Sequence, residues 1–169
     1  GFLGSGKTTF LKKYAEYLMD QGLNIGILEN DFGAINVDML MLHELRGDQC
    51  ELEMIAGGCD AESHRRRFRT KLISMRMCGY DRVLVEPSGI YDVDEFFDVL
   101  REEPLDQWYE IGNVIAILDA RLENNLSQQA DYLMASEAAN AGKVILSHAD
   151  AATREQCEDT VAHLNRALE

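Results

Sequence analysis

The first nine residues of the chain combine glycines, a lysine and threonines at a spacing that suits phosphate binding. Gly1-Phe2-Leu3-Gly4-Ser5-Gly6-Lys7-Thr8 has the form G-x-x-x-x-G-K-[ST]. Its glycines let successive backbone N–H groups point inward at a polyphosphate. Lys7 supplies a charge for the β- and γ-phosphates, and the Thr8 hydroxyl is a ligand for magnesium. The sequence therefore predicts a nucleotide-binding domain, with the nucleotide contacted by Gly4, Ser5, Gly6, Lys7, Thr8 and Thr9.

Short apolar segments that read as buried strands alternate with helical patterns along the rest of the chain. Strands are predicted over residues 24–29, 52–55, 82–86, 113–118 and 143–146. One helix follows the phosphate loop and ends near Gly22, and others are predicted over residues 63–77, 92–100, 128–141 and 153–168. This order indicates an α/β fold of the P-loop NTPase type, a mostly parallel sheet with helices on both faces.

Several acidic residues come at the ends of these predicted strands, which is the edge where such sheets bind ligands. They are found in Glu29-Asn30-Asp31, in Glu86-Pro87-Ser88-Gly89, and at Asp119 and Asp150. A carboxylate there can hold magnesium or orient a water molecule, and Glu86 before Pro-Ser-Gly is the strongest candidate. Each also has a simpler interpretation, because a buried carboxylate can be satisfied by backbone donors and Asp119 is typical of a turn.

Length and composition bound the remaining possibilities. With 169 residues and no linker or repeat, we expect residues 1–169 to form a single nucleotide-binding domain. A phosphate loop normally follows a buried strand, so we expect one to precede Gly1, outside this sequence.

The cysteines are scattered along the chain, at Cys50, Cys59, Cys78 and Cys157, and this spacing indicates a reducing, cytoplasmic setting. The net charge of −14 and the absence of a long apolar segment argue against nucleic acid or a membrane as partner.

Taken together, the motifs resemble those of the CobW-type metallochaperone GTPases, which are related to the nickel-handling HypB and UreG proteins. The family's phosphate loop matches Gly1 to Thr9, including Phe2 and Leu3, and its Glu-Asn-Glu-Phe-Gly motif appears as Glu29-Asn30-Asp31-Phe32-Gly33. Its apolar strand followed by Glu-x-x-Gly appears at residues 83–89. The resemblance covers the whole chain and implies GTP hydrolysis coupled to zinc, cobalt or nickel delivery or to cofactor insertion. The family's smaller C-terminal domain is absent from this sequence.

Two motifs depart from that pattern. The metal motif Gly-Cys-x-Cys-Cys falls on residues 58–62 and keeps only Cys59, so a zinc site would need Glu29, Glu62 or His64 to complete it, and a Cys59 that merely packs is the alternative. The base-reading motif [Asn/Ser]-Lys-x-Asp falls on Ser147-His148-Ala149-Asp150. Asp150 keeps the carboxylate that reads guanine, and an imidazole replaces the lysine stem that covers the base.

The resemblance assigns roles to the site residues. The expected catalytic residues are Lys7, Asp31 and Glu86. Magnesium is expected to be held by Thr8 together with Asp31 or Glu86. Cys59 and Glu29 are expected to bind the transition metal, while Ser147, His148 and Asp150 hold the guanine base. The expected partners are a guanine nucleotide and a metalloprotein client, with a homodimer left open.

Two other functions share the phosphate loop. An ATP-dependent small-molecule kinase would add an arginine-bearing lid, for which the basic run His64-Arg65-Arg66-Arg67-Phe68-Arg69-Thr70-Lys71 is the one candidate. Such runs are mostly the solvated face of a helix, although one arginine could serve a partner subunit or dock an acidic protein. A nucleotide-gated binding module with little turnover would fit the altered metal and base motifs.

Overall fold

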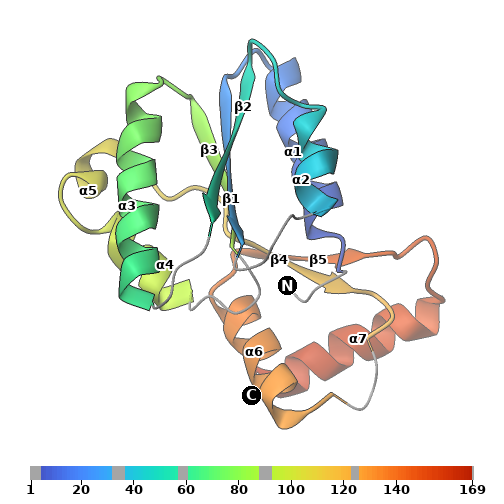
Figure 1. Cartoon of the computed structure of the whole chain (residues 1–169). Helices are drawn as coiled ribbons and strands as arrows, with labels where there is room; N and C mark the ends of the chain where they lie inside the picture. Colours follow the sequence, from blue (N-terminus) through green and yellow to red (C-terminus); the bar gives the residue numbers. More distant parts are fainter. Residues whose placement is uncertain (1–4, 32–36, 57–60, 88–92, 123–125, 169) are drawn as a thin grey trace. The chain divides into compact units, whose positions relative to one another are not determined.

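A computed structural model describes residues 5–31, 37–56, 61–87, 93–122 and 126–168. These residues divide into two compact units, one comprising Gly1–Lys7 with Ile111–Glu169 and the other Thr8–Glu110. Within the described ranges, no helix combines the length and apolar character needed to cross a bilayer. Each unit is built on parallel strands (Figure 1).

The unit Thr8–Glu110 contains a three-stranded parallel sheet in the order β2-β1-β3. Its strands are β1 (Ile25–Asp31), β2 (Cys50–Ala56) and β3 (Arg82–Pro87). Its helices are α1 (Lys7–Asp20, whose first residue belongs to the other unit), α2 (Val37–His43), α3 (Ala61–Met77), α4 (Val93–Leu100) and α5 (Leu105–Trp108).

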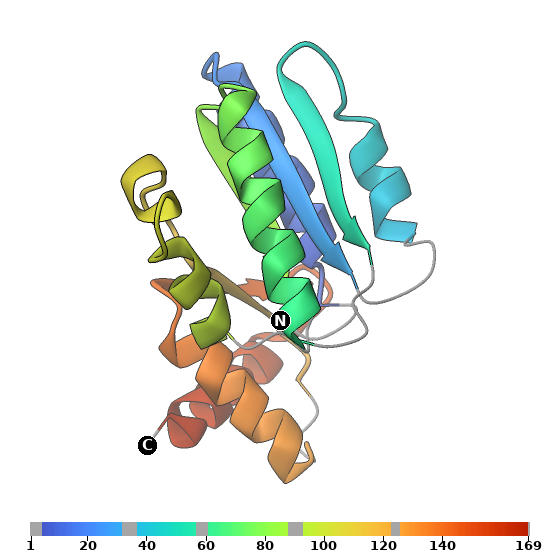
Figure 2. The same cartoon turned by 60° about the vertical axis from the view of Figure 1, so that its left-hand side comes forward.

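Alternate residues of β1 face opposite sides of this sheet, and each side has its own helices. Ile25 and Ile27 pack with Leu11, Ala15 and Leu18 of α1 on one face. On the other face, Leu28 packs with apolar residues of α3, α4 and α5, namely Phe68, Leu72, Met75, Val99 and Leu105. Figures 1 and 2 show α1 and α3 on opposite sides of β1. The prediction of a parallel sheet covered on both faces is thus confirmed for this unit.

Two glycines of this unit meet a packing or a backbone requirement that other residues would not. A Cβ on Gly26 would lie 2.6 Å from Met75 Cε and 2.7 Å from Tyr80 Cδ2, so only glycine lets α3 and Tyr80 approach β1 this closely. Gly22, near which the helix was expected to end, follows α1 with a φ of +80°, the left-handed conformation that glycine adopts after a helix.

The unit formed by Gly1–Lys7 and Ile111–Glu169 has a two-stranded parallel sheet of β4 (Ile115–Asp119) and β5 (Lys143–Ser147). Leu118 packs with Met134 and Ala138 of α6 (Gln128–Ala139) and Leu164 of α7 (Arg154–Ala167). Thr153 and Gln156 form a capping box that begins α7. The strand register places Asp119 beside Ser147, so both strands end at the same level.

Candidate functional site

The described part of the phosphate loop leads directly into α1, because residues 1–4, including Gly4, lie outside the described residues. Gly6 has a φ of +84°, a backbone conformation that favours glycine. Ser5 is 4% exposed, and its Oγ has no hydrogen-bond partner among the described residues. A buried hydroxyl without a partner is costly, so this atom fits a site that a polar ligand such as a phosphate would complete.

The N-terminal turn of α1 is joined to the end of β3 by a hydrogen bond between side chains. The Thr8 hydroxyl donates to Glu86, at 3.2 Å from Oε1 and 3.3 Å from Oε2. Thr8 is buried and Glu86 is half-buried. Lys7 is half-buried and Thr9 is exposed in the same turn. A hydroxyl facing a carboxylate at a helix N-terminus is an oxygen-rich donor set of the kind that magnesium prefers.

A second carboxylate lies beside Glu86 on the same face of the sheet. Strand register pairs Glu29 of β1 with Glu86 of β3. Because Ile25 and Ile27 face α1, the alternation along β1 turns Glu29 to that face as well. Glu29 is only 2% exposed. Two neighbouring carboxylates repel each other, and a divalent cation would relieve that repulsion. Asp31, the other predicted ligand, ends β1, and its side chain lies outside the described residues.

In the unit that contains β4 and β5, the phosphate loop meets the predicted base-reading motif. A Cβ on Gly6 would lie 3.3 Å from Ser147 Cβ and 3.9 Å from His148 Cε1. Ser147 ends β5, and its Oγ donates to the Leu118 carbonyl at 3.1 Å. The chain turns at His148, which has a φ of +52°, and Asp150 is exposed two residues later. The described structure therefore brings two distant predicted motifs together.

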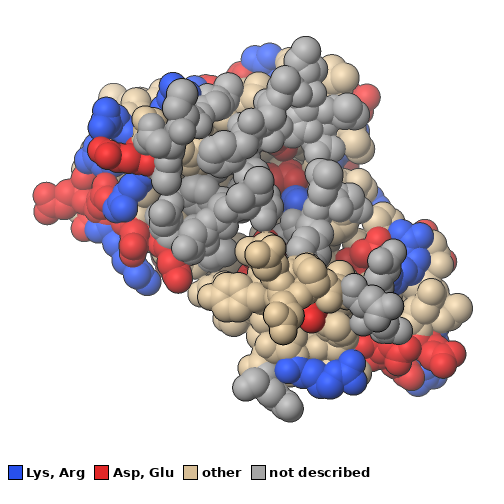
Figure 3. Space-filling view, turned by 60° about the horizontal axis from the view of Figure 1, so that its bottom comes forward, with Lys and Arg blue, Asp and Glu red and all other residues tan. Residues whose placement is uncertain are grey.

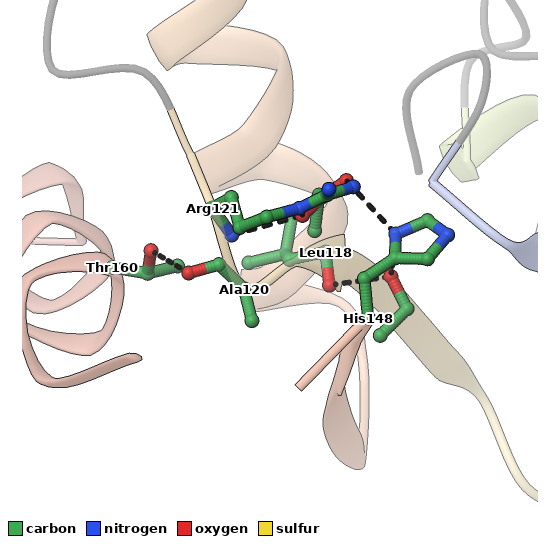
Figure 4. Close-up of polar contacts among 7 residues, drawn as sticks. Leu118, Ala120, Arg121, His148 and Thr160 are labelled. Atoms are coloured by element: carbon green, nitrogen blue, oxygen red, sulfur yellow. Dashed lines mark hydrogen bonds and ion pairs between the residues drawn. The ribbon is translucent and has the colours of Figure 1, made fainter. Parts of the chain in front are cut away.

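The end of β4 adds a network that the sequence analysis did not identify (Figure 4). The Asp119 carboxylate accepts hydrogen bonds from Arg121 and from the His148 ring. Mainly because of the Arg121 side chain, the pKa of Asp119 is lowered to about 2. The hydrogen bond and charge of Asp119, and more weakly the charge of Asp150, raise the pKa of Arg121. The sequence signal was Asp119-Ala120-Arg121, a turn in which the Arg121 N–H donates back to Asp119 at 2.9 Å.

The predicted transition-metal loop falls outside the described residues at Cys59. Among the residues that are described, no group of three or more His, Cys, Asp and Glu side chains could hold a metal ion. Glu62 is exposed and paired with Arg66 at 3.2 Å, whereas His64 is 1% exposed. Since these two residues lie two positions apart on α3, their side chains point to different sides of the helix.

The basic run on α3 is largely committed to ion pairs within its own unit. Arg65 pairs with Glu102, and Arg69 lies 3.3 Å from the same carboxylate. Lys71 pairs with Glu53 of β2 at 2.7 Å. Figure 3 shows positive and negative side chains interleaved on the side where α3 and α4 lie, at its left. These contacts favour the interpretation of a solvated, internally paired helix face over that of a kinase lid.

Comparison with known proteins agrees with the motifs. A model of the family described as CobW/HypB/UreG, nucleotide-binding domain, matches residues 1–169. The chain is 29% identical over 178 residues to the zinc chaperone YjiA of Escherichia coli (strain K12), covering 98% of this chain and 52% of YjiA. It is 27% identical over 156 residues to the zinc chaperone YeiR of the same strain, covering 92% of this chain and 46% of YeiR. The chain spans about half the length of these relatives and belongs to the family of CobW/HypB/UreG nucleotide-binding domains.

Proposed function

We propose that residues 1–169 form one domain that binds GTP with magnesium, hydrolyses it, and couples the nucleotide state to the delivery of zinc. The observation that carries this proposal is the contact between the Thr8 hydroxyl and both oxygens of Glu86. It joins the phosphate-loop motif to the acidic residue of the Glu-x-x-Gly motif. The family match supports nucleotide binding, and the names of YjiA and YeiR support zinc as the cargo.

The phosphate end of the nucleotide would be held by the first turn of α1 and the residues before it. Lys7 contributes a positive charge to the β- and γ-phosphates, and the loop amides and the N-terminal end of the helix add partial positive charge. The buried Ser5 hydroxyl and the Thr9 side chain complete the polar surroundings of the phosphates. These groups stabilise the charge that develops on the phosphoryl oxygens when the bond to the leaving group breaks.

Thr8 and Glu86 would hold magnesium, with Asp31 as a further ligand. Magnesium bound there would neutralise negative charge on the β- and γ-phosphate oxygens. Glu86, or its neighbour Glu29, is also placed to accept a hydrogen bond from the attacking water and so to orient it. Loss of the γ-phosphate would release the segments that follow Glu29 and Glu86 from their contacts, as in other nucleotide switches.

The guanine base would be read by the residues that follow β5. The Asp150 carboxylate can accept two hydrogen bonds from guanine N1–H and N2–H, a pair that adenine does not offer. Ser147 and His148 would flank the base. The proximity of this segment to Gly6 supports the proposal, because a nucleotide bound to the loop must place its base within reach of it.

Zinc would bind through Cys59 and Glu29, with the buried Glu29 carboxylate lying beside Glu86. A site that includes a residue next to the magnesium ligands would let zinc affinity depend on the nucleotide. The proposed client is a metalloprotein, the proposed location of this protein is the cytoplasm, and assembly as a homodimer is compatible with this function.

Two measurements test the proposal: the rate of phosphate release from GTP and from ATP, and the zinc affinity of the protein in its two nucleotide states. Phosphate release should be faster from GTP than from ATP, and zinc affinity, measured against a chromogenic chelator, should differ between the GTP-bound and GDP-bound protein. Faster release from ATP with transfer to a small acceptor would instead support a kinase. Nucleotide-dependent zinc binding without phosphate release would support a binding module without turnover.

A further inference from the structure

The Asp119 carboxylate is the centre of a small polar network between the ends of β4 and β5. Its Oδ1 accepts from the Arg121 backbone N–H at 2.9 Å and from Arg121 Nε at 3.1 Å. Its Oδ2 lies 3.0 Å from an Arg121 terminal nitrogen and 2.9 Å from His148 Nδ1. The Asp119 carboxylate thus holds the Arg121 guanidinium, the backbone turn at Arg121 and the imidazole of His148, which lies 29 residues further along the chain.

The charge state of this carboxylate decides how the imidazole is held. Mainly through the Arg121 side chain, the pKa of Asp119 is held near 2, so the group is ionised at neutral pH. An ionised carboxylate only accepts hydrogen bonds, so the proton of this contact must reside on His148 Nδ1. The Asp119 carboxylate therefore fixes the orientation of the ring and keeps a proton on Nδ1.

Neighbouring bonds hold the two segments together around this contact. The Ala120 N–H donates to the Ser147 carbonyl at 2.9 Å, and the Thr160 hydroxyl of α7 donates to the Ala120 carbonyl at 2.9 Å. His148 itself has a φ of +52°, a conformation that costs free energy for a residue with a Cβ. In this conformation His148 Nδ1 lies 2.9 Å from Asp119 Oδ2, and a dashed line in Figure 4 marks the contact at the labelled His148 ring.

The held ring lies beside the phosphate loop. A Cβ on Gly6 would lie 3.9 Å from His148 Cε1, the atom between the two ring nitrogens, and 3.6 Å from Ser147 Oγ. Gly6 directly precedes Lys7, so the ring lies near the loop backbone that is proposed to cradle the phosphates.

We propose that Asp119 is a positioning residue for nucleotide binding that acts through His148. Arg121 keeps the Asp119 carboxylate charged and oriented. The carboxylate fixes the imidazole, which lies near Gly6 and which, in the proposed function, flanks the base. This inference rests on the proposed function, since it concerns how firmly the same nucleotide site is held.

The test is a double-mutant cycle read as GDP affinity by calorimetry. Asp119→Asn keeps the size of the side chain and removes its charge, and it should weaken GDP binding about tenfold, as expected for loss of a charge-assisted contact. His148→Ala should have a similar effect. The double variant should bind GDP within about twofold of the weaker single variant, because both changes remove one interaction.

His148→Lys is the matched partner of His148→Ala, because Lys and Ala incur the same backbone cost at a positive φ. A lysine can still pair with Asp119, so this variant should recover most of the lost GDP affinity. Arg154→Ala, which removes an exposed ion pair on α7 in the same unit, is the control and should bind GDP as the parent does. Urea unfolding of every variant separates lost stability from lost affinity.

Additive losses in the double variant, or unchanged GDP affinity in both single variants, would overturn the inference. So would equal affinities for His148→Ala and His148→Lys. These outcomes leave the proposed function intact as long as the parent protein binds GDP. If the parent protein binds no GDP, the proposed function and this inference fall together.

Discussion

Thr8 and Glu86 lie 78 positions apart in the sequence, yet the Thr8 hydroxyl donates to both oxygens of the Glu86 carboxylate. The contact joins the first turn of α1 to the end of β3. It is the arrangement expected of a hydroxyl and a carboxylate that share one cation, because both groups present oxygen to the same space.

Glu86→Gln should therefore reduce the part of nucleotide affinity that depends on magnesium. In the presence of magnesium, GTP affinity should fall about tenfold, the effect of losing one charged ligand. In EDTA, the parent and the variant should bind GTP alike. Calorimetric titration with GTP in both buffers measures the two differences.

Glu53→Gln is the matched control, since Glu53 lies on β2 and pairs with Lys71 of α3. It should bind GTP as the parent does in both buffers. An equal loss for Glu86→Gln with and without magnesium would show that Glu86 acts only as a structural partner of Thr8.

The choice of base should depend on the Asp150 carboxylate. Asp150→Asn replaces an acceptor by a donor that faces the guanine N–H groups, so GTP affinity should fall by at least about tenfold while ATP affinity changes little. Asp159→Asn, an exposed change on α7, serves as the control. Equal losses for GTP and ATP would mean that residues 147–150 form a turn without a role in base choice.

Zinc binding should depend on Cys59 and on the nucleotide. Cys59→Ser should lower zinc affinity, and the loss should differ between the GTP-bound and GDP-bound protein, as competition with a chromogenic chelator would reveal. Binding to the parent should also release protons, because a thiol must deprotonate to bind zinc. Cys78→Ser, which changes an exposed free cysteine, is the control. Identical zinc binding by the parent and Cys59→Ser in both states would make Cys59 a packing residue.

The lowered pKa of Asp119 predicts how stability responds to acid. The folded protein holds the Asp119 pKa at about 2, below the ordinary value of 3.8, chiefly through the Arg121 side chain. A depressed carboxyl pKa stabilises the fold above the ordinary value, and that stabilisation is lost as the pH falls from about 4 through about 2. Asp119→Asn should thus be less stable than the parent at pH 7, with the difference narrowing in this range. Urea denaturation at each pH measures the free energy of unfolding of both proteins. If the difference between them stayed constant down to pH 2, the lowered pKa of Asp119 would not contribute to stability.

Much of the fold could be predicted from sequence because its strands are short apolar runs that end at polar residues. The predicted strand over residues 82–86 corresponds to β3 (Arg82–Pro87), for example. Two helices were missed. α5 (Leu105–Trp108) is a single turn after Pro104, and α2 (Val37–His43) spans only seven residues, too few for a helical period to emerge.

Less of the site could be predicted, because sequence motifs identify residues without their neighbours. The phosphate loop and Glu86 were recognisable individually, but their contact depends on how α1 packs on the sheet. The link between Asp119 and His148 joins the last residue of β4 to the turn after β5 and depends on the register of these two strands. The motifs do not encode which residues become neighbours in space, so these contacts are seen only in the folded structure.

The central claim is that the loop ending in Lys7 binds the phosphates of GTP, and titration of the Lys7→Ala protein with GTP tests it most directly. Removing the charge should lower GTP affinity by at least about tenfold, since charge-assisted contacts contribute roughly 1.5–3 kcal/mol. Lys13→Ala, an exposed lysine of the same helix, should leave GTP affinity unchanged. Equal GTP affinity for the parent, Lys7→Ala and Lys13→Ala would contradict the account.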